Sequence, residues 1–167
     1  MAEPIRTVAV LVANPALSSI LSMTLAGAPS LRVRPFESQL ALTTYLRLAP
    51  VDLIVADFDS ETARADRLVE GLHADAKLER RDFQVIALAS SLAIEDKAAS
   101  MHAGIDEIIM KPMSPKYLVE RVLARLARRM PAAKPARAAS KARPAEGWAR
   151  FGDNVVPLFA RSPEVQH

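Results

Sequence analysis

Short apolar runs alternate with amphipathic stretches over the first 130 residues of the chain. Four of these runs are apolar almost throughout, as strands buried on both faces of a sheet should be. They span residues 7–12, 51–57, 83–88 and 106–110. A fifth segment, residues 31–36, alternates apolar and basic side chains and indicates a strand nearer a sheet edge.

Between the strands, apolar side chains recur at the three- and four-residue spacing of amphipathic helices. Proline is tolerated in the first turn of a helix, so Pro15 and Pro115 predict where the first and last helices begin. The apolar positions that mark four helices are Leu17, Ile20, Leu21, Thr24 and Leu25; Leu42, Tyr45 and Leu46; Leu68, Val69 and Leu72; and Leu118, Val122 and Leu126. A more polar helix is expected over residues 92–102. Five strands alternating with five helices predict an α/β fold with a doubly wound parallel sheet.

Polar side chains follow three of the predicted strands, namely Asn14, Asp57 and Lys111. Function in a parallel sheet gathers at the carboxyl ends of its strands. A carboxylate there can accept a phosphoryl group, provided that a divalent cation and a basic side chain offset the charge. Taken singly, these residues favour a plainer alternative, in which Asp57 caps the next helix and Lys111 is its partner charge.

The order of elements and five motifs together resemble the CheY-like receiver domains of bacterial response regulators. The motifs are VAVLVANP (8–15), VDLIVAD (51–57), VIALAS (85–90), HAGIDEII (102–109) and MKPMSP (110–115). The resemblance covers residues 5–130 and implies the receiver, or flavodoxin-like, fold. It also implies that Asp57 is the phospho-acceptor, that Lys111 is the lysine of the family, and that the Lys111–Pro112 bond is cis.

The predicted cation site departs from this family. Its members end the first strand with an acidic pair that binds magnesium, whereas this chain has Ala13 and Asn14. A hard dication that faces only Asn14 and Asp57 should bind weakly, so Mg²⁺ is a doubtful cofactor. Asp59 and Glu61 lie nearby and can restore part of the missing charge.

The residues that read out phosphorylation in the family also differ. The hydroxyl residue expected at the end of the fourth strand is Ala89, with Ser90 one place further on, and Ile108 replaces the aromatic residue of the fifth strand. We therefore interpret residues 1–130 as a degenerate receiver domain that is kept as a docking module. Its acceptor site is expected to consist of Asp57, Lys111, Asn14 and Ser90.

The formal net charge of +3 lies entirely in the last 37 residues, because residues 1–130 carry 16 basic and 16 acidic side chains. Residues 131–147 are rich in Ala, Pro and basic side chains and hold no large apolar one, so we expect a disordered linker. Residues 148–167 hold the only Trp and three of the eight aromatic residues. That composition predicts a ligand-binding tail, although a solubilising role stays open on charge alone.

The tail contains side chains suited to guanine. Arg150 can bond the O6 and N7 edge, Asp153 can accept from the N1–H and amino groups, and Trp148 offers a stacking surface. Their spacing looks like the R-x-x-D motif of cyclic di-GMP sites. A CheY-like body with an arginine-rich tail is similar to the Cle group of receiver-like effectors, which bind cyclic di-GMP and interact with the flagellar motor switch. The binding residues that this resemblance implies are Arg137, Arg143, Trp148, Arg150 and Asp153.

Three classes of function follow from these features. The first is a cyclic di-GMP effector whose body docks on a protein partner, such as the motor switch. The second is a single-domain response regulator that is phosphorylated at Asp57 in a two-component phosphorelay. The third is a nucleic-acid adaptor, which the small charge of the tail and the lack of a helix-turn-helix argue against, so no DNA binding is expected.

The surface predicted to dock on a partner is formed by the fourth helix, the fifth strand and the fifth helix. It carries the basic residues Lys116, Arg121, Arg125, Arg128 and Arg129. The alternative interpretation of these charges is the solvated side of an amphipathic helix.

Composition excludes several chemistries. The absence of cysteine excludes thiol catalysis, disulfides and Cys-based metal sites. The three histidines are far apart in sequence, and neither Ser18 nor Ser19 forms a catalytic triad with them, so no enzyme activity is expected. The longest apolar run, Val8 to Ala13, is too short to span a bilayer and does not resemble a signal peptide. A cytoplasmic protein without membrane insertion is expected.

Overall fold

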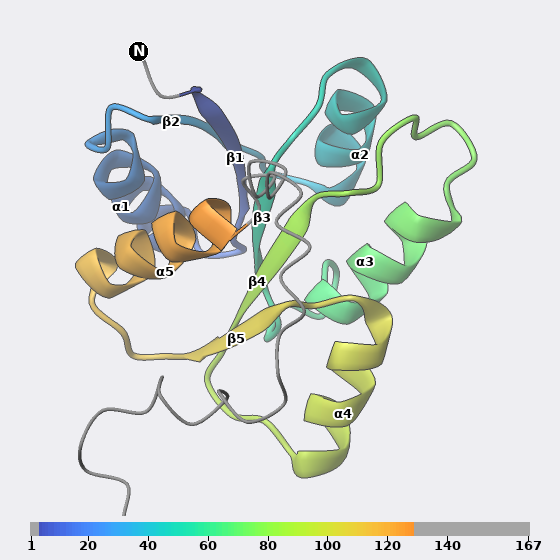
Figure 1. Cartoon of the computed structure of the whole chain (residues 1–167). Coiled ribbons are helices and arrows are strands. Elements are labelled where there is room, and N and C mark those ends of the chain that lie inside the picture. The colour runs from blue at the N-terminus through green and yellow to red at the C-terminus, as the bar shows by residue number, and fades with distance from the viewer. Residues whose placement is uncertain (1–3, 129–167) are drawn as a thin grey trace, which may run out of the picture. The chain divides into compact units, whose positions relative to one another are not determined.

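Five parallel strands form one sheet in the order β2-β1-β3-β4-β5 (Figure 1). The computed structural model describes residues 4–128. The strands are β1 (Arg6–Leu11), β2 (Leu31–Pro35), β3 (Leu53–Asp57), β4 (Gln84–Ala89) and β5 (Glu107–Met110). The predicted doubly wound α/β fold of the receiver type is confirmed, and every expected strand is present within two residues of its predicted bounds.

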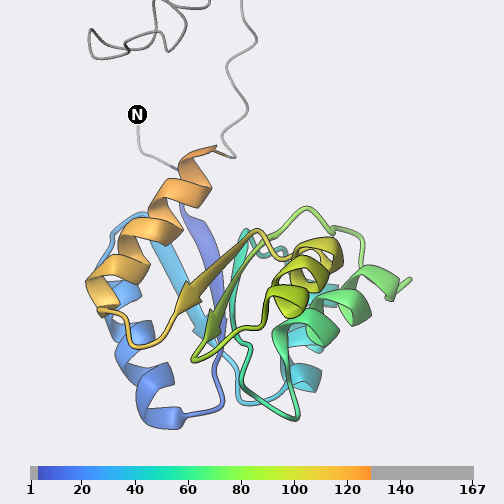
Figure 2. The same ribbon diagram turned by 90° about the horizontal axis from the view of Figure 1, so that it is seen from below.

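Helices cover both faces of this sheet, with α1 and α5 on one side and α2, α3 and α4 on the other (Figure 2). The helices are α1 (Pro15–Ala26), α2 (Gln39–Leu48), α3 (Ala65–Ala74), α4 (Ile94–Ala103) and α5 (Pro115–Arg128). None of the helices within residues 4–128 is long and apolar enough to cross a membrane.

The strand order explains the two kinds of strand pattern. β3 lies between β1 and β4, and all five of its residues are buried. Because side chains alternate along a strand, Val8 packs beneath α1 and α5 while Ala9 packs in the core on the opposite face. β2 lies at the edge, where Arg32 and Arg34 are exposed. The central strands are thus apolar on both faces because helices cover both of them.

Two turns show why particular residues stand at the ends of elements. β3 begins at Leu53 rather than at residue 51, and just before it the Asp52 carboxylate accepts a hydrogen bond from the Thr7 amide and pairs with Arg6. α4 ends at Gly104, whose φ of +107° favours glycine. A Cβ at Gly104 would also lie 3.0 Å from Nε2 of His73, so a larger residue there would crowd His73 as well as strain the backbone.

Candidate functional site

Asp57 and Lys111 meet at the carboxyl edge of the sheet. Asp57 is the last residue of β3, and Lys111 follows β5. The Lys111 Nζ donates a hydrogen bond of 3.0 Å to Asp57 Oδ1. Asp57 is only 5% exposed, and the Lys111–Pro112 bond is cis, as the resemblance implied. The fold therefore places a nearly buried carboxylate and an ammonium group in direct contact.

Asp59 is the third member of this cluster. Its Oδ2 lies 2.7 Å from Lys111 Nζ, and its carboxylate accepts a hydrogen bond from the Ser90 amide at 2.8 Å. The Asp59 amide in turn donates to Asp57 Oδ1 at 3.1 Å. Asp59 thus connects the loops that follow β3, β4 and β5. In the sequence it is only a carboxylate two residues beyond Asp57, and nothing in that spacing shows where it points.

The electrostatics keep Asp59 and Lys111 charged. Burial raises the pKa of Asp59, but the hydrogen bonds from Lys111 and Ser90 outweigh it, so the pKa lies below its ordinary value. Burial lowers the pKa of Lys111, but its contacts with Asp59 and Asp57 raise it by more than burial lowers it. The pKa of Lys111 therefore lies above its ordinary value. At neutral pH, Asp59 is an anion and Lys111 is a cation, each stabilised by the other.

The end of β1 contributes no charge to the cluster. Asn14 caps α1, because its Oδ1 accepts hydrogen bonds from the amides of Ala16 at 3.0 Å and Leu17 at 3.1 Å. Ala13, next to it, has no side-chain donor or acceptor. The one neutral oxygen that the sequence offered for a cation at this strand end is therefore engaged by the backbone of α1.

These residues do not fit a magnesium site of the kind that the resemblance implied. Mg²⁺ requires near-octahedral oxygen ligands, normally with carboxylates among them. The carboxylates at this edge belong to Asp57 and Asp59, and both contact Lys111. Within residues 4–128, no group of three or more His, Cys, Asp or Glu side chains is arranged to hold a metal ion. Lys111 supplies the only positive charge that the described residues place between these two carboxylates.

The plainer interpretation of Asp57, as the cap of the next helix, is wrong. α3 begins at Ala65, and Arg64, at the cap position, makes no capping hydrogen bond with its side chain. The other site residue, Ser90, is exposed and contributes its amide to Asp59. Ala89 is buried as the last residue of β4, so its position offers no hydroxyl group.

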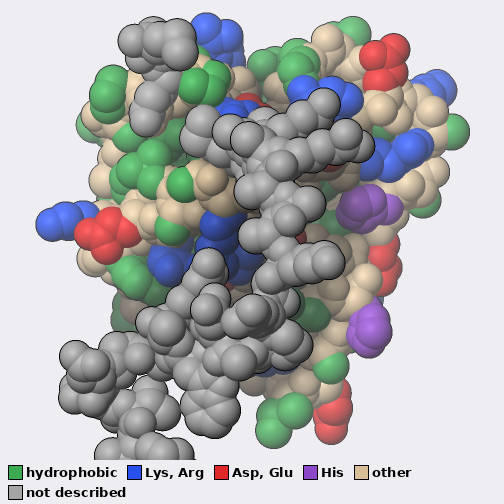
Figure 3. Space-filling model, viewed as in Figure 1, with side chains coloured by type: hydrophobic (Ala, Val, Ile, Leu, Met, Phe, Trp, Pro, Cys, Tyr) green, Lys and Arg blue, Asp and Glu red, His purple; other side chains and the backbone are tan. Residues whose placement is uncertain are grey.

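The surface formed by α4, β5 and α5 is less basic than its residue count indicates. Glu107 of β5 accepts hydrogen bonds from Nε and Nη2 of Arg121, and it accepts another of 2.6 Å from Arg125 Nε. Burial raises the pKa of Glu107, but these two arginines outweigh it and hold the pKa below its ordinary value. Acidic and basic side chains are accordingly interspersed over the visible part of this side (Figure 3). The surface predicted to dock on a partner is therefore mixed in charge, and Arg129, one of its five basic residues, lies outside the described residues.

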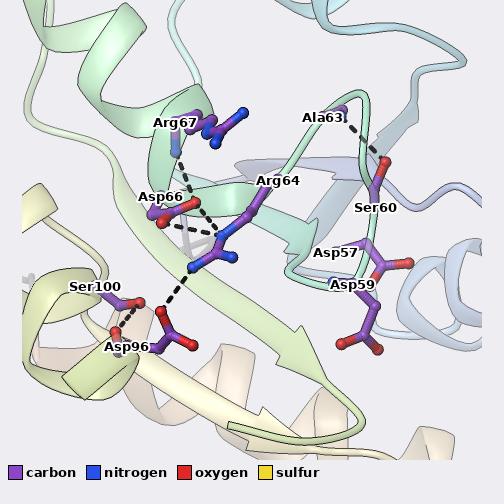
Figure 4. Close-up of polar contacts among 9 residues, drawn as sticks. All are labelled: Asp57, Asp59, Ser60, Ala63, Arg64, Asp66, Arg67, Asp96 and Ser100. Carbon is purple, nitrogen blue, oxygen red and sulfur yellow. Dashed lines mark hydrogen bonds and ion pairs between the residues drawn. The ribbon is translucent and has the colours of Figure 1, made fainter. Parts of the chain in front are cut away.

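A polar hollow of about 470 Å³ adjoins the cluster on the side of α3 and α4. It is lined by Phe58, Asp59, Ser60, Glu61, Arg64, Arg67, Ser91 and Asp96. Several of these residues are shown in Figure 4, where Arg64 reaches from the start of α3 toward Asp96 of α4. No local pattern in the sequence marks Arg64, because only the fold brings Asp96 as well as Asp66 within reach of its side chain.

The predicted ligand-binding tail lies outside the described residues. This holds for Arg137, Arg143, Trp148, Arg150 and Asp153, and for the proposed boundary between linker and tail at residue 147. These assignments stay predictions from the sequence.

Comparison with known proteins supports the fold. No family model and no curated protein matches the chain. A CheY-like receiver domain protein from Methanospirillum hungatei is 18% identical, with a TM-score of 0.66 over 74% of this chain and 95% of its own. Vibrio cholerae CheY4 is 16% identical, with a TM-score of 0.64 over 72% and 98%. The BeF3-activated receiver domain of DrrB, from Thermotoga maritima, is 20% identical, with a TM-score of 0.62 over 74% and 98%.

Nearly the whole length of each of these solved structures aligns with this chain. The chain therefore has the fold of response-regulator receiver domains. At such low identity the similarity concerns the fold alone. What the chain does must be argued from its own side chains.

Proposed function

We propose that this chain is a receiver-like signalling protein that acts without ordinary phosphotransfer. Its folded unit docks on a protein partner, and its C-terminal segment binds cyclic di-GMP. The observation that carries the proposal is the state of the acceptor edge. The Asn14 amide oxygen is engaged in capping α1, and the two carboxylates at this edge, those of Asp57 and Asp59, are bridged by Lys111. At an edge of this kind the ammonium group of Lys111, and not a metal ion, offsets the two carboxylates, so the folded unit is suited to be a stable platform.

The sequence of the tail supports the ligand. Arg150 and Asp153 match the two edges of guanine, and Trp148 supplies a stacking surface worth roughly 1–3 kcal/mol per base. Folding a free segment around a ligand costs roughly 2–5 kcal/mol, so several contacts must act together. Arg137 and Arg143 provide further guanine or phosphate contacts. A dinucleotide with two guanines and two phosphates satisfies all of these groups, and the proposal assigns the chain no catalytic activity.

The exposed apolar side chains of α4, β5 and α5 support docking on a protein. Ile94, Met101, Met110 and Tyr117 are all large and exposed, and Ile94 is 89% exposed. Apolar groups of this size next to interspersed charges are typical of protein–protein contact surfaces. By its resemblance to CheY-like effectors, the partner proposed for this surface is the flagellar motor switch.

The ligand is tested by isothermal titration of cyclic di-GMP into the full chain. We expect binding to the unaltered protein and a loss of at least about fivefold in affinity for Arg150→Ala, because a bidentate contact to guanine contributes about 1–3 kcal/mol. Arg161→Ala is the matched control, since it removes the same charge from the same segment outside the R-x-x-D motif. Equal loss in both variants, or no binding by the unaltered chain, contradicts the proposal.

A second function is favoured by one contact. The Lys111 Nζ lies 3.0 Å from Asp57 Oδ1, the arrangement in which an ammonium group could offset the charge of an acyl phosphate. This supports the single-domain response regulator phosphorylated at Asp57. Incubation with acetyl phosphate and Mg²⁺, followed by intact-mass measurement, separates the two functions. We expect no stoichiometric phosphoryl adduct. A stoichiometric adduct that is absent from Asp57→Asn would establish the second function instead.

A further inference from the structure

Helix α4 is held to the rest of the fold by few contacts. Ser100 is its only buried residue, and its cap position, Ala93, makes no capping hydrogen bond with its side chain. Ile94, in its first turn, is almost fully exposed. Because little apolar surface is removed from water along α4, individual polar contacts have a large share in fixing its position.

One such contact comes from Arg64, at the start of α3. Its Nη2 lies 3.0 Å from Asp96 Oδ1 in the first turn of α4, and its Nε lies 2.9 Å from Asp66 Oδ1 in the first turn of α3 (Figure 4). A single guanidinium group therefore joins the first turns of two neighbouring helices. Its fork geometry allows both carboxylates to be bound at once.

The same guanidinium group lies on an aromatic ring of the acceptor loop. The Arg64 Cζ is 4.2 Å from the centroid of the Phe58 ring, within the range of a cation–π contact. Phe58 directly follows Asp57, is 6% exposed, and donates its amide to Leu88 O at 2.7 Å. A shift of the backbone at Asp57 therefore moves the surface on which Arg64 rests.

We propose that Arg64 is a switchable link between the acceptor loop and α4. While Phe58 keeps its position, Arg64 holds Asp96 and fixes the first turn of α4. When the loop that begins at Asp57 shifts, Arg64 keeps its short-range partner Asp66 and releases Asp96, so that α4 is freed. The link goes beyond the proposed function, because it requires neither cyclic di-GMP nor phosphorylation. The contacts of Arg64 with Phe58 and Asp96 thus connect the acceptor loop to α4 through residues that lie outside the five receiver-like motifs.

The first experiment measures whether the link holds α4. Hydrogen–deuterium exchange of the full chain is followed by mass spectrometry in Arg64→Ala and in Asp96→Asn. We expect amides of α4 to exchange roughly two- to fivefold faster in both variants, since a partly exposed ion pair contributes little more than that, while α5 is unchanged. Arg67→Ala is the matched control, because this neighbouring arginine is exposed and its side chain makes no ion pair among the described residues. Unchanged α4 exchange in Arg64→Ala overturns the proposal.

The second experiment measures coupling to the acceptor loop. Asp57→Asn removes the charge that faces Lys111 with little change in size, and we expect it to change the exchange of α4. In the Arg64→Ala background the same substitution should leave α4 exchange unchanged. An equal effect in both backgrounds, or no effect in either, overturns the proposal.

Arg64→Lys should restore at least half of the α4 protection lost in Arg64→Ala, because lysine keeps the positive charge. The restoration is expected to be partial, because lysine lacks the fork of the guanidinium group. Rescue would show that pairing, and not merely side-chain volume, holds the helix.

Discussion

The two helices that flank β5 are held in opposite ways. α5 buries Leu118, Val122 and Leu126 against the sheet, whereas α4 buries only Ser100. Both helices also make ion pairs with neighbouring elements. The ion pairs of α5 with Glu107 add to its buried apolar side chains, whereas the ion pair of α4 with Arg64 has no such apolar contact to add to. One side of β5 is therefore fixed by apolar burial, whereas on the other side polar contacts have the larger share.

The charged contacts differ in the same direction. Glu107 is 13% exposed in its side chain and binds two arginines of α5, so its charge is well compensated in a partly buried place. Asp96 is 43% exposed in its side chain, and Arg64 is the only residue within 4–128 with which it forms an ion pair. A contact of the first kind stabilises the whole domain, while one of the second kind mainly positions a helix.

The largest expected effect comes from removing the apolar anchor of α5. Leu118→Ala should lower the free energy of unfolding by about 2–5 kcal/mol, because it leaves a cavity under a fully buried side chain. Met101→Ala in α4 is the control and should change it by less than about 0.5 kcal/mol. Urea denaturation measures both. A loss in Met101→Ala as large as that in Leu118→Ala would show that α4 is anchored like α5.

The next effect comes from the charge between β5 and α5. Glu107→Gln keeps the size of the side chain but removes the charge that holds Arg121 and Arg125, and it should cost about 1–3 kcal/mol. Glu95→Gln, in the exposed first turn of α4, removes a charge with no ion pair among the described residues and serves as the control. Thermal unfolding of the two variants side by side measures the difference. Equal melting temperatures would contradict the assigned role of Glu107.

The pH dependence of stability sharpens the role of Glu107. Its folded pKa lies below the ordinary value of 4.5, so the folded state binds the proton less tightly than the unfolded chain. Its stabilisation is therefore complete above that value and is lost as the pH falls through the folded pKa. Unfolding measured between about pH 3 and pH 6 should show a steeper acid limb for the unaltered chain than for Glu107→Gln. Parallel limbs would contradict the lowered pKa.

The smallest effect on the whole domain is expected for the link to α4. Asp96→Asn should reduce the free energy of unfolding by less than about 1 kcal/mol, because both partners are partly exposed. Urea denaturation measures it, with Glu107→Gln as the reference. Should Asp96→Asn cost as much as Glu107→Gln, the contact would be part of the cooperative core and not a local adjustment.

Much of the fold could be predicted from the periodicity of apolar residues. The strands through Val8 and Val55 are apolar on both faces because they are central, and the sequence pattern shows this directly. Pro15 correctly placed the start of α1. The polar pattern over residues 92–102 predicted α4 with its start two residues and its end one residue too early, since a helix with little buried surface has a weak apolar signal.

The candidate site was less accessible to such reasoning. The contact between Asp57 and Lys111 followed from parallel strands that end at one edge. The direction of Asp59 did not, because its loop has no period from which a side-chain direction can be inferred. The engagement of Asn14 by α1 was also hidden, since an Asn before Pro15 is equally compatible with a ligand and a cap.

By itself, the sequence determined the order of elements, the buried strands and which polar residues reach the carboxyl edge, because these depend on local spacing and on the burial of apolar faces. Only the tertiary structure decided which charges meet. Lys111 lies between Asp57 and Asp59, and Arg64 lies between two helices. Ion pairs between loops and helix ends depend on how separate segments are brought together in space, and no local pattern of residues encodes that distance.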